Sequence, residues 1–451
     1  MLMRKNLRLV LAAATAVSLT GGLLSLTAGT AAAAPAKYAD DFNGDGYRDY
    51  VSHGSGAGVV ITYGTATGPG TKTKRIDQSN PGIPGTLTGN DGFGGSSAAA
   101  DFNSDGYADL AVADMSETVG KRKRQGMVVM LWGSKSGLGS KATTLAQKSP
   151  TSEWLFGRHL AVGDFDGNGK PDLAVADWFT VHIYRGGFSS KDGGTRTVTR
   201  HDPKHGALRE ITGLAAGKVT KDKASDLYVL GAGYVNDRQT SGTWFLRGGS
   251  TVTAPRKPTT YNSSSPDWSP VGVVADFDKN GYGDLAVTES GYKKHAGSVL
   301  VMRGGADGAG SSYRLTQDSA GVATSLKAGD EFGFDMSVGD TNRDGYPDLA
   351  VGVLEDIGRD QSAGGVHVLR GGKKGVSGGG SQWFTKETAG LPSKPFGSFG
   401  GETRLRDADR DGDADLFISD NSGRSFVLKG GGAGVSTKSS SVVGLRANFP
   451  Q

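Results

Sequence analysis

The sequence contains no cysteine, and only 8% of its 451 residues are aromatic. Without cysteine the chain forms no disulfide and carries no lipid-modified cysteine. Hydrophobic residues make up only 36% of the chain, whereas glycine accounts for 74 residues. Helix-rich folds do not tolerate this much glycine, because each glycine inside a helix costs roughly 0.5–1 kcal/mol relative to alanine. The composition instead favours short strands connected by many turns.

Long apolar runs are missing after the first 36 residues. This N-terminal segment differs in composition from the rest of the chain. Basic residues at positions 4, 5 and 8 precede an apolar run from Leu9, which ends in small residues before Pro35. This order predicts a secretory signal peptide over residues 1–36, cleaved between Ala33 and Ala36; an uncleaved membrane anchor is the alternative. No later segment approaches the ~18 apolar residues of a membrane helix. We therefore expect a secreted, monomeric mature protein without a membrane span.

One pattern, D-x-[DN]-x-[DN]-G-x-x-D followed by an apolar strand, recurs along the rest of the chain. Six intact copies begin at Asp41, Asp101, Asp164, Asp276, Asp340 and Asp407, and a degenerate copy begins at Lys218. The starts lie 54 to 67 residues apart, and each repeat has four short strand-like segments without helical periodicity. The pattern predicts an all-β fold, a seven-bladed β-propeller of four-stranded blades over residues 37–451. An open β-solenoid is the alternative, but the repeat is too long for one coil.

The acidic loops place oxygen atoms in a pattern suited to a metal ion. Side-chain oxygens recur at positions 1, 3, 5 and 9, and position 7 offers its backbone carbonyl, while glycine at position 6 permits a sharp turn. Oxygen ligands of this kind suit Ca²⁺, whereas Mg²⁺ prefers to keep its waters. The candidate ligands are Asp41, Asn43, Asp45, Tyr47, Asp49, Asp101, Asn103, Asp105, Tyr107, Asp109, Asp164, Asp166, Asn168, Lys170, Asp172, Asp276, Asp278, Asn280, Tyr282, Asp284, Asp340, Asn342, Asp344, Tyr346, Asp348, Asp407, Asp409, Asp411, Asp413 and Asp415.

Electrostatics distinguish a metal site from a plain turn. Three carboxylates about 5 Å apart repel one another by roughly 3 kcal/mol per pair at an effective dielectric constant of about 20. The sum of about 10 kcal/mol per loop is comparable with the stability of a typical domain, and a plain Asp-Gly turn needs only one aspartate. We therefore predict about six structural Ca²⁺ ions. The loop is not an EF-hand, because Val112 occupies position 12 of the second copy, where that motif has glutamate.

The degenerate fourth copy is the exception to this pattern. Lys218, Thr220 and Ala224 replace the residues at positions 1, 3 and 7, while Asp222 and Asp226 remain. We predict that this loop binds no metal. We also expect the Lys218 ammonium to act as the counter-charge to the two remaining carboxylates.

The repeats resemble the FG-GAP repeats of the integrin α-subunit head, a seven-bladed calcium-binding propeller. The FG pairs appear as Phe93-Gly94, Phe156-Gly157, Phe332-Gly333 and Phe399-Gly400, and the metal loops match position by position. Repeats one, four and five lack the FG pair, and the leg domains and membrane span of an integrin are absent. Similar stand-alone secreted proteins occur in bacteria. The resemblance implies the fold, the calcium sites and a recognition role, but no named ligand.

Catalytic motifs are weak in this sequence. The one G-x-S-x-G match, Gly375 to Gly379, lies in a glycine run without the following helix that the active form of this motif requires. The seven histidines show no metal-ligand spacing. We therefore predict a binding or recognition protein, adhesin- or lectin-like; a secreted hydrolase or lyase on the same scaffold is the alternative.

A ligand is expected on the face opposite the metal loops, where the other loops carry aromatic side chains. The candidates are Trp154, Trp268, Tyr234 and Tyr292, of which exposed rings would suit sugars. Loss of the signal segment changes the net charge from +4 to about +1, and six Ca²⁺ ions would raise it to about +13. This charge favours an extracellular acidic glycan, a cell-wall polymer or a protein ligand. Nucleic acid is not expected, because the basic residues are dispersed.

Overall fold

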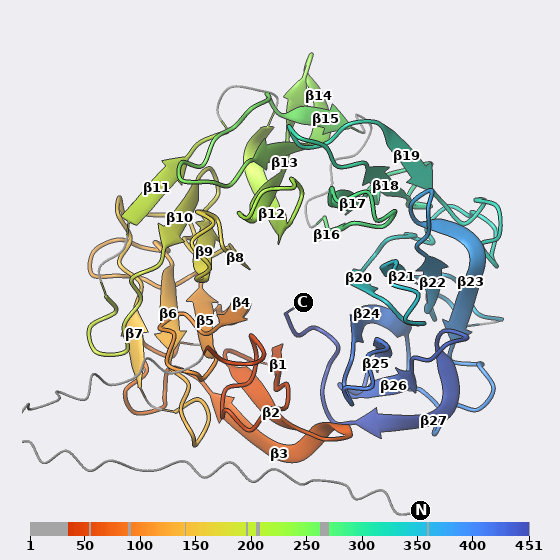
Figure 1. Cartoon of the computed structure of the whole chain (residues 1–451), viewed down its shortest axis with the longest axis horizontal. Coiled ribbons are helices and arrows are strands. Elements are labelled where there is room, and N and C mark those ends of the chain that lie inside the picture. Colours follow the sequence, from red (N-terminus) through yellow and green to blue (C-terminus); the bar gives the residue numbers. More distant parts are fainter. Residues whose placement is uncertain are drawn as a thin grey trace, which may run out of the picture. The chain divides into compact units, whose positions relative to one another are not determined.

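The structure, a computed structural model, describes residues 35–450 except 54–55, 89–91, 140, 195–196, 204–207, 262–269 and 359. The unit from Ala34 to Gln451 consists of seven antiparallel sheets set around a common centre, as Figure 1 shows. The predicted seven-bladed β-propeller is thus confirmed. The predicted signal segment lies outside the described residues, apart from Pro35 and Ala36. In the described part of the chain, no helix is long and apolar enough to cross a membrane.

The strands follow one another through the blades in chain order. Blade one contains β1 (Tyr50–His53), β2 (Val59–Thr65) and β3 (Gly68–Ile76); blade two contains β4 (Phe93–Ala100), β5 (Asp109–Asp114), β6 (Met127–Leu131) and β7 (Ala142–Thr144); blade three contains β8 (His159–Gly163), β9 (Asp172–Ala176), β10 (Val181–Arg185) and β11 (Thr197–His201). Blade four contains β12 (Leu208–Gly217), β13 (Asp226–Val235), β14 (Arg238–Leu246) and β15 (Thr259–Tyr261); blade five contains β16 (Gly272–Ala275), β17 (Asp284–Thr288), β18 (Val299–Met302) and β19 (Ser312–Leu315). Blade six contains β20 (Met336–Gly339), β21 (Asp348–Val353), β22 (Gly365–Arg370) and β23 (Ser377–Thr385); blade seven contains β24 (Phe399–Arg406), β25 (Asp415–Asp420), β26 (Ser425–Lys429) and β27 (Ser436–Val443).

The core lies between the blades, which pack face to face around the ring. In β5, β9, β17 and β21, every residue is buried, because neighbouring blades cover both faces of these strands. This two-sided cover explains why the D-L-A-V segments are continuously apolar instead of alternating. One cluster joins Val51 and Ile61 of blade one to Leu110 and Val129 of blade two. The repeats therefore stabilise one another, and no blade has a complete core of its own.

The FG pairs are explained by close approach of the backbone between neighbouring blades. Phe93 is buried at the start of β4, and its carbonyl accepts a hydrogen bond from the Gly58 N–H of the preceding blade at 2.7 Å. Gly94 has a φ of +93°, and a Cβ atom there would lie 2.7 Å from the Gly58 carbonyl oxygen. Glycine is therefore required at this position by both conformation and space.

The C-terminal segment closes the ring beside β1, as the position of the C-terminus in Figure 1 shows. Phe449 is buried and lies edge-on to Tyr50 of blade one and Phe417 of blade seven, with ring centroids 5.3 Å apart in both pairs. Arg406 donates to the Pro450 carbonyl at 2.6 Å and pairs with Asp40 at 2.7 Å. Blade one has three strands among the described residues, so the C-terminal segment lies against a blade that has fewer strands than the other six.

Candidate metal centres

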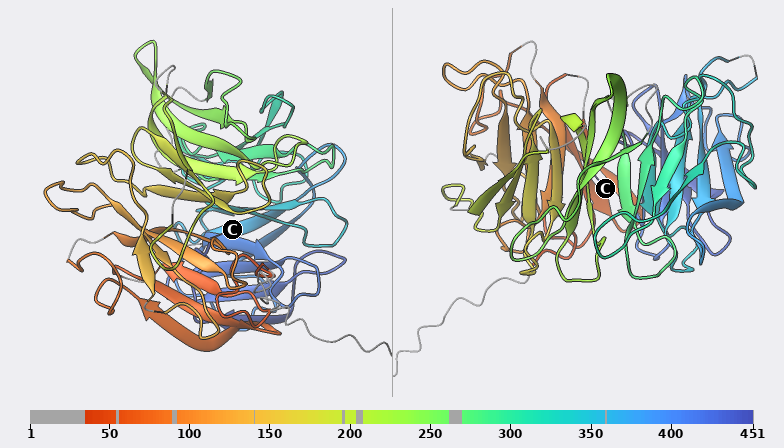
Figure 2. Two further views of the ribbon diagram at one scale, coloured as in Figure 1. Left: turned by 60° about the vertical axis from the view of Figure 1, so that its left-hand side comes forward. Right: turned by 90° about the horizontal axis from the view of Figure 1, so that it is seen from above.

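All seven acidic loops lie at the same end of the ring. In blades two to seven each loop connects the first strand to the second, and in blade one it leads into β1. Successive antiparallel strands alternate in direction, so these loops share one end with the turns between the third and fourth strands. The loops between the second and third strands and the connections between blades lie at the other end; Figure 2 shows the loops gathered at both faces. We number the metal loops one to seven in chain order.

Each loop wraps its backbone around its own side-chain oxygens. In loop two, Asp101 accepts hydrogen bonds from the Asp105 N–H at 3.0 Å and the Gly106 N–H at 3.1 Å. The Asn103 side-chain oxygen accepts from the Asp105 N–H at 3.0 Å, and Asp105 accepts from the Tyr107 N–H at 3.1 Å. The side chains at positions 1, 3 and 5 therefore converge on the interior of the turn, as a cation site requires.

The carboxylate at position 9 anchors the loop to the rest of its blade. Asp109 is fully buried, accepting from the Phe102 N–H at 3.0 Å and from the Gly133 N–H at 2.9 Å. Burial, together with the charges of Asp105 and Asp101, raises the pKa of Asp109 to about 8. Burial likewise raises the pKa of the position-9 carboxyl groups of Asp49 and Asp172 to about 7, and of Asp284 and Asp415 to about 6.

The donor sets fit a hard cation. Asp164, Asp166 and Asp172 each offer an oxygen within 4.8 Å of the other two, and so do Asp407, Asp409 and Asp411. In loops one, two, three, five and six, an asparagine at position 3 or 5 supplies an amide oxygen in place of one carboxylate. Buried carboxylate oxygens of Asp284 and Asp407 have no hydrogen-bond partner among the described residues. Unpartnered buried oxygens in an all-oxygen set are what Ca²⁺ coordination would satisfy.

The counter-charge in the degenerate fourth loop is not the one expected. The Lys218 ammonium donates to the Lys223 carbonyl, so its predicted role toward the two carboxylates is wrong. Asp222 instead pairs with Arg247 at 3.0 Å. Asp226 is buried and accepts from the Thr220 N–H at 2.7 Å and the Thr220 hydroxyl at 3.0 Å. Arg247 can reach Asp222 because it directly follows β14, whose end lies beside the loop.

A basic residue at the equivalent strand end also neutralises three of the intact loops. Arg303 pairs with Asp278 at 2.8 Å in loop five, and Arg370 pairs with Asp348 at 2.8 Å in loop six. In loop seven the Lys429 ammonium lies 2.9 Å from Asp409 and 3.0 Å from Asp415. The same position holds Tyr63, Trp132 and Arg185 in blades one, two and three, and Arg185 donates to the Ser250 carbonyl. Among the described residues, the carboxylates of loops one to three form no ion pair.

Neighbouring loops contact one another through positions 4 and 7. The Lys279 ammonium of loop five lies 4.2 Å from the centre of the Tyr346 ring in loop six. Arg343 of loop six pairs with Asp413 of loop seven at 3.0 Å, and Arg410 of loop seven lies 4.2 Å from the ring of Tyr47 in loop one. The aromatic residues at position 7 thus receive cations from the preceding loop, a role that sequence reasoning, which assigned them only a carbonyl ligand, missed.

Catalytic geometry is sparse in the described part of the chain. Ser377 of the G-x-S-x-G match begins β23, not a strand-to-helix turn. His182 and Asp177 are 3.1 Å apart but almost fully buried. Ser97 Oγ lies 3.3 Å from His53 Nε2, yet among the described residues no hydrogen bond orients His53 Nδ1. A nucleophile and base without an orienting group fall short of the arrangement that acyl transfer uses.

The predicted ligand-binding aromatics lie on separate blades. Trp154 packs edge-on against Phe179 at 5.5 Å, Tyr234 is 43% exposed, and Tyr292 lies under Arg314 at 4.8 Å. The fourth candidate, Trp268, falls outside the described residues. Among the described residues, no ring contact joins these three side chains to one another.

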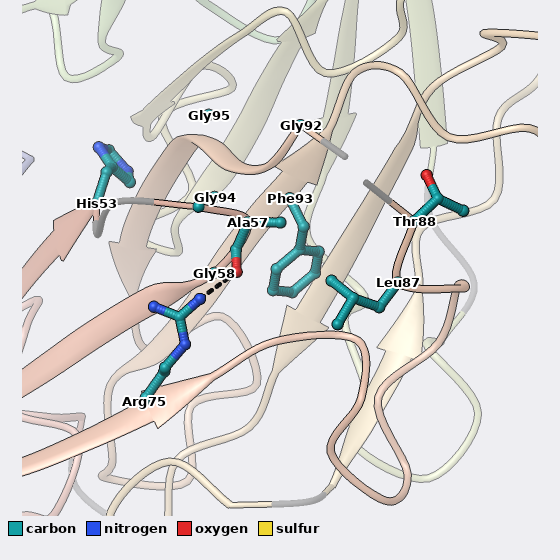
Figure 3. A pocket seen from close by; sticks show the side chains of 11 residues that line it. His53, Ala57, Gly58, Arg75, Leu87, Thr88, Gly92, Phe93, Gly94 and Gly95 are labelled. Carbon is teal, nitrogen blue, oxygen red and sulfur yellow. Dashed lines mark hydrogen bonds between the residues drawn. The ribbon is translucent and has the colours of Figure 1, made fainter. Parts of the chain in front are cut away.

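A cavity of about 790 Å³ opens on the face opposite the metal loops, at the junction of blades one and two. In the close view of Figure 3, Phe93 and Leu87 lie on one side and His53 on the other. Arg75 donates to the Ala57 carbonyl at 2.5 Å across the lower wall. Glycines 56, 58, 92, 94 and 95 supply much of the remaining lining.

Comparison with known proteins shows which family these repeats resemble. A family model described as FG-GAP-like repeat matches residues 41–112 and 101–175, and one described as FG-GAP repeat matches residues 332–369. "Integrin alpha pat-2" of Caenorhabditis briggsae is 38% identical over 112 residues, covering 22% of this chain and 9% of that protein. "Integrin alpha-7" of Homo sapiens is 30% identical over 156 residues (33% and 12%), and "Phosphatidylinositol-glycan-specific phospholipase D" of Rattus norvegicus is 29% identical over 148 residues (31% and 18%). The chain therefore spans less than a fifth of the length of each of these relatives.

Proposed function

We propose that this chain, an integrin α N-terminal-like β-propeller built on FG-GAP repeats, is a secreted recognition module stabilised by Ca²⁺ in six of its seven acidic loops. The observation that carries the calcium assignment is the convergence of side-chain oxygens in loops whose position-9 carboxylates are buried. Bound Ca²⁺ would supply the positive charge that offsets their mutual repulsion. The chain's own residues would hold it through positions 1, 3, 5 and 9 and the carbonyl of position 7.

Calcium stoichiometry tests this assignment. We expect close to six equivalents per chain in equilibrium dialysis, and Asp164→Asn should remove about one of them, because that loop loses a charged ligand. Asp222→Asn in the degenerate loop is the matched control and should leave the number unchanged, since Arg247 already neutralises Asp222. A wild-type chain that stays folded and metal-free in millimolar calcium contradicts the proposal.

The basic residues at the strand ends predict the order in which the loops bind Ca²⁺. Loops one to three, whose carboxylates form no ion pair among the described residues, should bind Ca²⁺ more tightly than loops five to seven. In loop seven, Lys429→Met removes an ammonium from within 3.0 Å of two carboxylates and should raise calcium affinity roughly tenfold. Titration calorimetry of this variant is compared with Lys438→Met, which removes a positive charge elsewhere in blade seven. Equal affinities for the two variants would show that Lys429 does not compete with the ion.

We assign the recognition role to the face of the ring opposite the metal loops. This face carries the loops between the second and third strands and the connections between blades. Propeller faces of this kind present loops from several blades on a rigid scaffold. The relatives named integrin alpha favour binding over catalysis by similarity alone. Screening the calcium-loaded protein on a glycan array tests the role. Substrate turnover that Ser97→Ala abolishes would favour the hydrolase alternative instead.

A further inference from the structure

A second cavity, of about 1150 Å³, lies on the face opposite the metal loops, at the junction of blades six and seven. It is formed by three connections: residues 354–358 and 360–364 between β21 and β22, residues 386–398 between β23 and β24, and residues 421–424 between β25 and β26. All three start or end at the strand ends remote from metal loops six and seven. The cavity is therefore separate from the calcium sites.

An exposed aromatic ring projects at this cavity from a fixed backbone. Phe396 is 67% exposed, the largest value among the exposed large hydrophobic residues described. Its N–H donates to the Asp420 carboxylate at 3.0 Å, and its carbonyl accepts from the Asn421 N–H at 3.0 Å. Backbone hydrogen bonds on both sides of this residue fix the segment that carries the exposed ring. Binding of a ligand therefore costs less conformational entropy than it would on an unordered segment.

The charges around the ring favour an anion. The lining carries Lys386, Lys394 and Arg424 against the single carboxylate of Asp360. Lys386 contacts Asp360, whereas Lys394 is exposed and forms no ion pair within the described residues. Arg424 donates to the Lys394 carbonyl at 2.8 Å and pairs with Asp420 at 2.8 Å. Among the cations that line the cavity, the Lys394 ammonium is therefore the one available to pair with a ligand. Its backbone is fixed by the hydrogen bond from Arg424.

The buried carboxylate of Asp420 fixes the positions of the residues around the cavity. It is 2% exposed, and its carboxylate accepts from the Phe396 N–H, from the Ser422 N–H at 2.9 Å and from Arg424. One buried charge therefore fixes the aromatic segment, the guanidinium and the β25–β26 turn together. Asn421 and Ser398, joined by a hydrogen bond of 2.7 Å, add amide and hydroxyl groups to the lining.

We propose that this cavity binds a carboxylated sugar of an acidic polysaccharide. The apolar face of a pyranose would stack on Phe396, its carboxylate would pair with Lys394, and its hydroxyl groups would reach Asn421, Ser398 and the hydroxyl of Ser362. A sugar ring is the class that needs an aromatic plane, a cation and several small polar groups at once. This inference rests on the proposed recognition function and names its ligand class.

Binding of oligogalacturonate to the calcium-loaded full chain, measured by calorimetry beside a neutral galactose oligomer of equal length, tests the site. We expect the acidic oligomer to bind and the neutral one to bind at least tenfold more weakly. Phe396→Ala and Lys394→Gln should each weaken the acidic oligomer roughly tenfold, corresponding to about 1.4 kcal/mol. Phe334→Ala, which removes an exposed ring that does not line this cavity, is the control and should leave binding unchanged.

Three results would overturn the inference. One is equal binding of the acidic and neutral oligomers, and another is equal loss in Phe396→Ala and Phe334→Ala. The third is binding of the acidic oligomer to the wild type and the Phe396→Ala variant alike; it refutes this site while leaving the recognition function intact. Failure of the proposed function differs from these, because the wild type would then bind no array ligand. Unchanged melting temperatures for Phe396→Ala and Lys394→Gln establish that both variants are folded.

Discussion

Chelation with EDTA should lower the melting temperature of this protein by on the order of 10 °C. The estimate follows from linkage: each site held at 100 times its dissociation constant adds about 2.7 kcal/mol, so loops one to three alone add about 8 kcal/mol. For a chain of this size, each kcal/mol shifts the melting temperature by about 1–2 °C. The cause is local, because without the ion the carboxylates of loop three, for example, remain within 4.8 Å of one another and Asp172 is buried. Thermal unfolding followed by circular dichroism, with and without added calcium, measures the shift.

The pH dependence of this shift identifies the groups responsible. Burial raises the pKa of Asp49 and Asp172 to about 7 and of Asp109 to about 8, far above the unfolded value near 3.8. In EDTA their contribution to stability is complete below the unfolded pKa and is lost as the pH rises through the folded pKa. The gap between the calcium and EDTA melting temperatures should therefore widen from pH 6 to pH 8. A gap that is the same at both pH values, after metal removal is verified, contradicts this origin.

Phe449→Ala should weaken the junction of blades one and seven and destabilise the protein by about 3–5 kcal/mol, as expected for a buried phenylalanine. Its ring is 1% exposed and fills the space between Tyr50 and Phe417, one from each of the blades that meet there. Six junctions are held by continuous chain, whereas the contacts between blades one and seven that the described residues show come from side chains and the C-terminal segment. Denaturant unfolding in calcium measures the loss.

Phe396→Ala is the matched control for that experiment. It removes the same side chain, but from a position that is 67% exposed. Its free energy of unfolding should stay within about 0.5 kcal/mol of the wild type, as is usual for surface positions. Similar losses in the two variants would mean that the buried contacts of Phe449 with Tyr50 and Phe417 add no stability.

Sequence reasoning captured the parts of the structure that each repeat specifies locally. The D-L-A-V segments became the buried second strands, and the glycines of the FG pairs occupy positions that exclude a side chain. The convergence of Asp101, Asn103 and Asp105 follows from spacing within nine residues, which the turn alone enforces. Such features depend on neighbours in the chain, so a repeated pattern is enough to predict them.

Contacts between residues far apart in the sequence were decided only by the tertiary structure. Lys218 and Arg247 are both basic, yet only the end of β14 brings a cation to Asp222. Phe396 has no sequence signal, because its exposure results from hydrogen bonds to Asp420 and Asn421 on another strand connection. By itself, the sequence determined the number of blades and the position of each acidic loop. The tertiary structure decided which loops carry their own cations, how the ring closes and where an aromatic side chain is exposed to water, since each depends on contacts between residues far apart in the sequence.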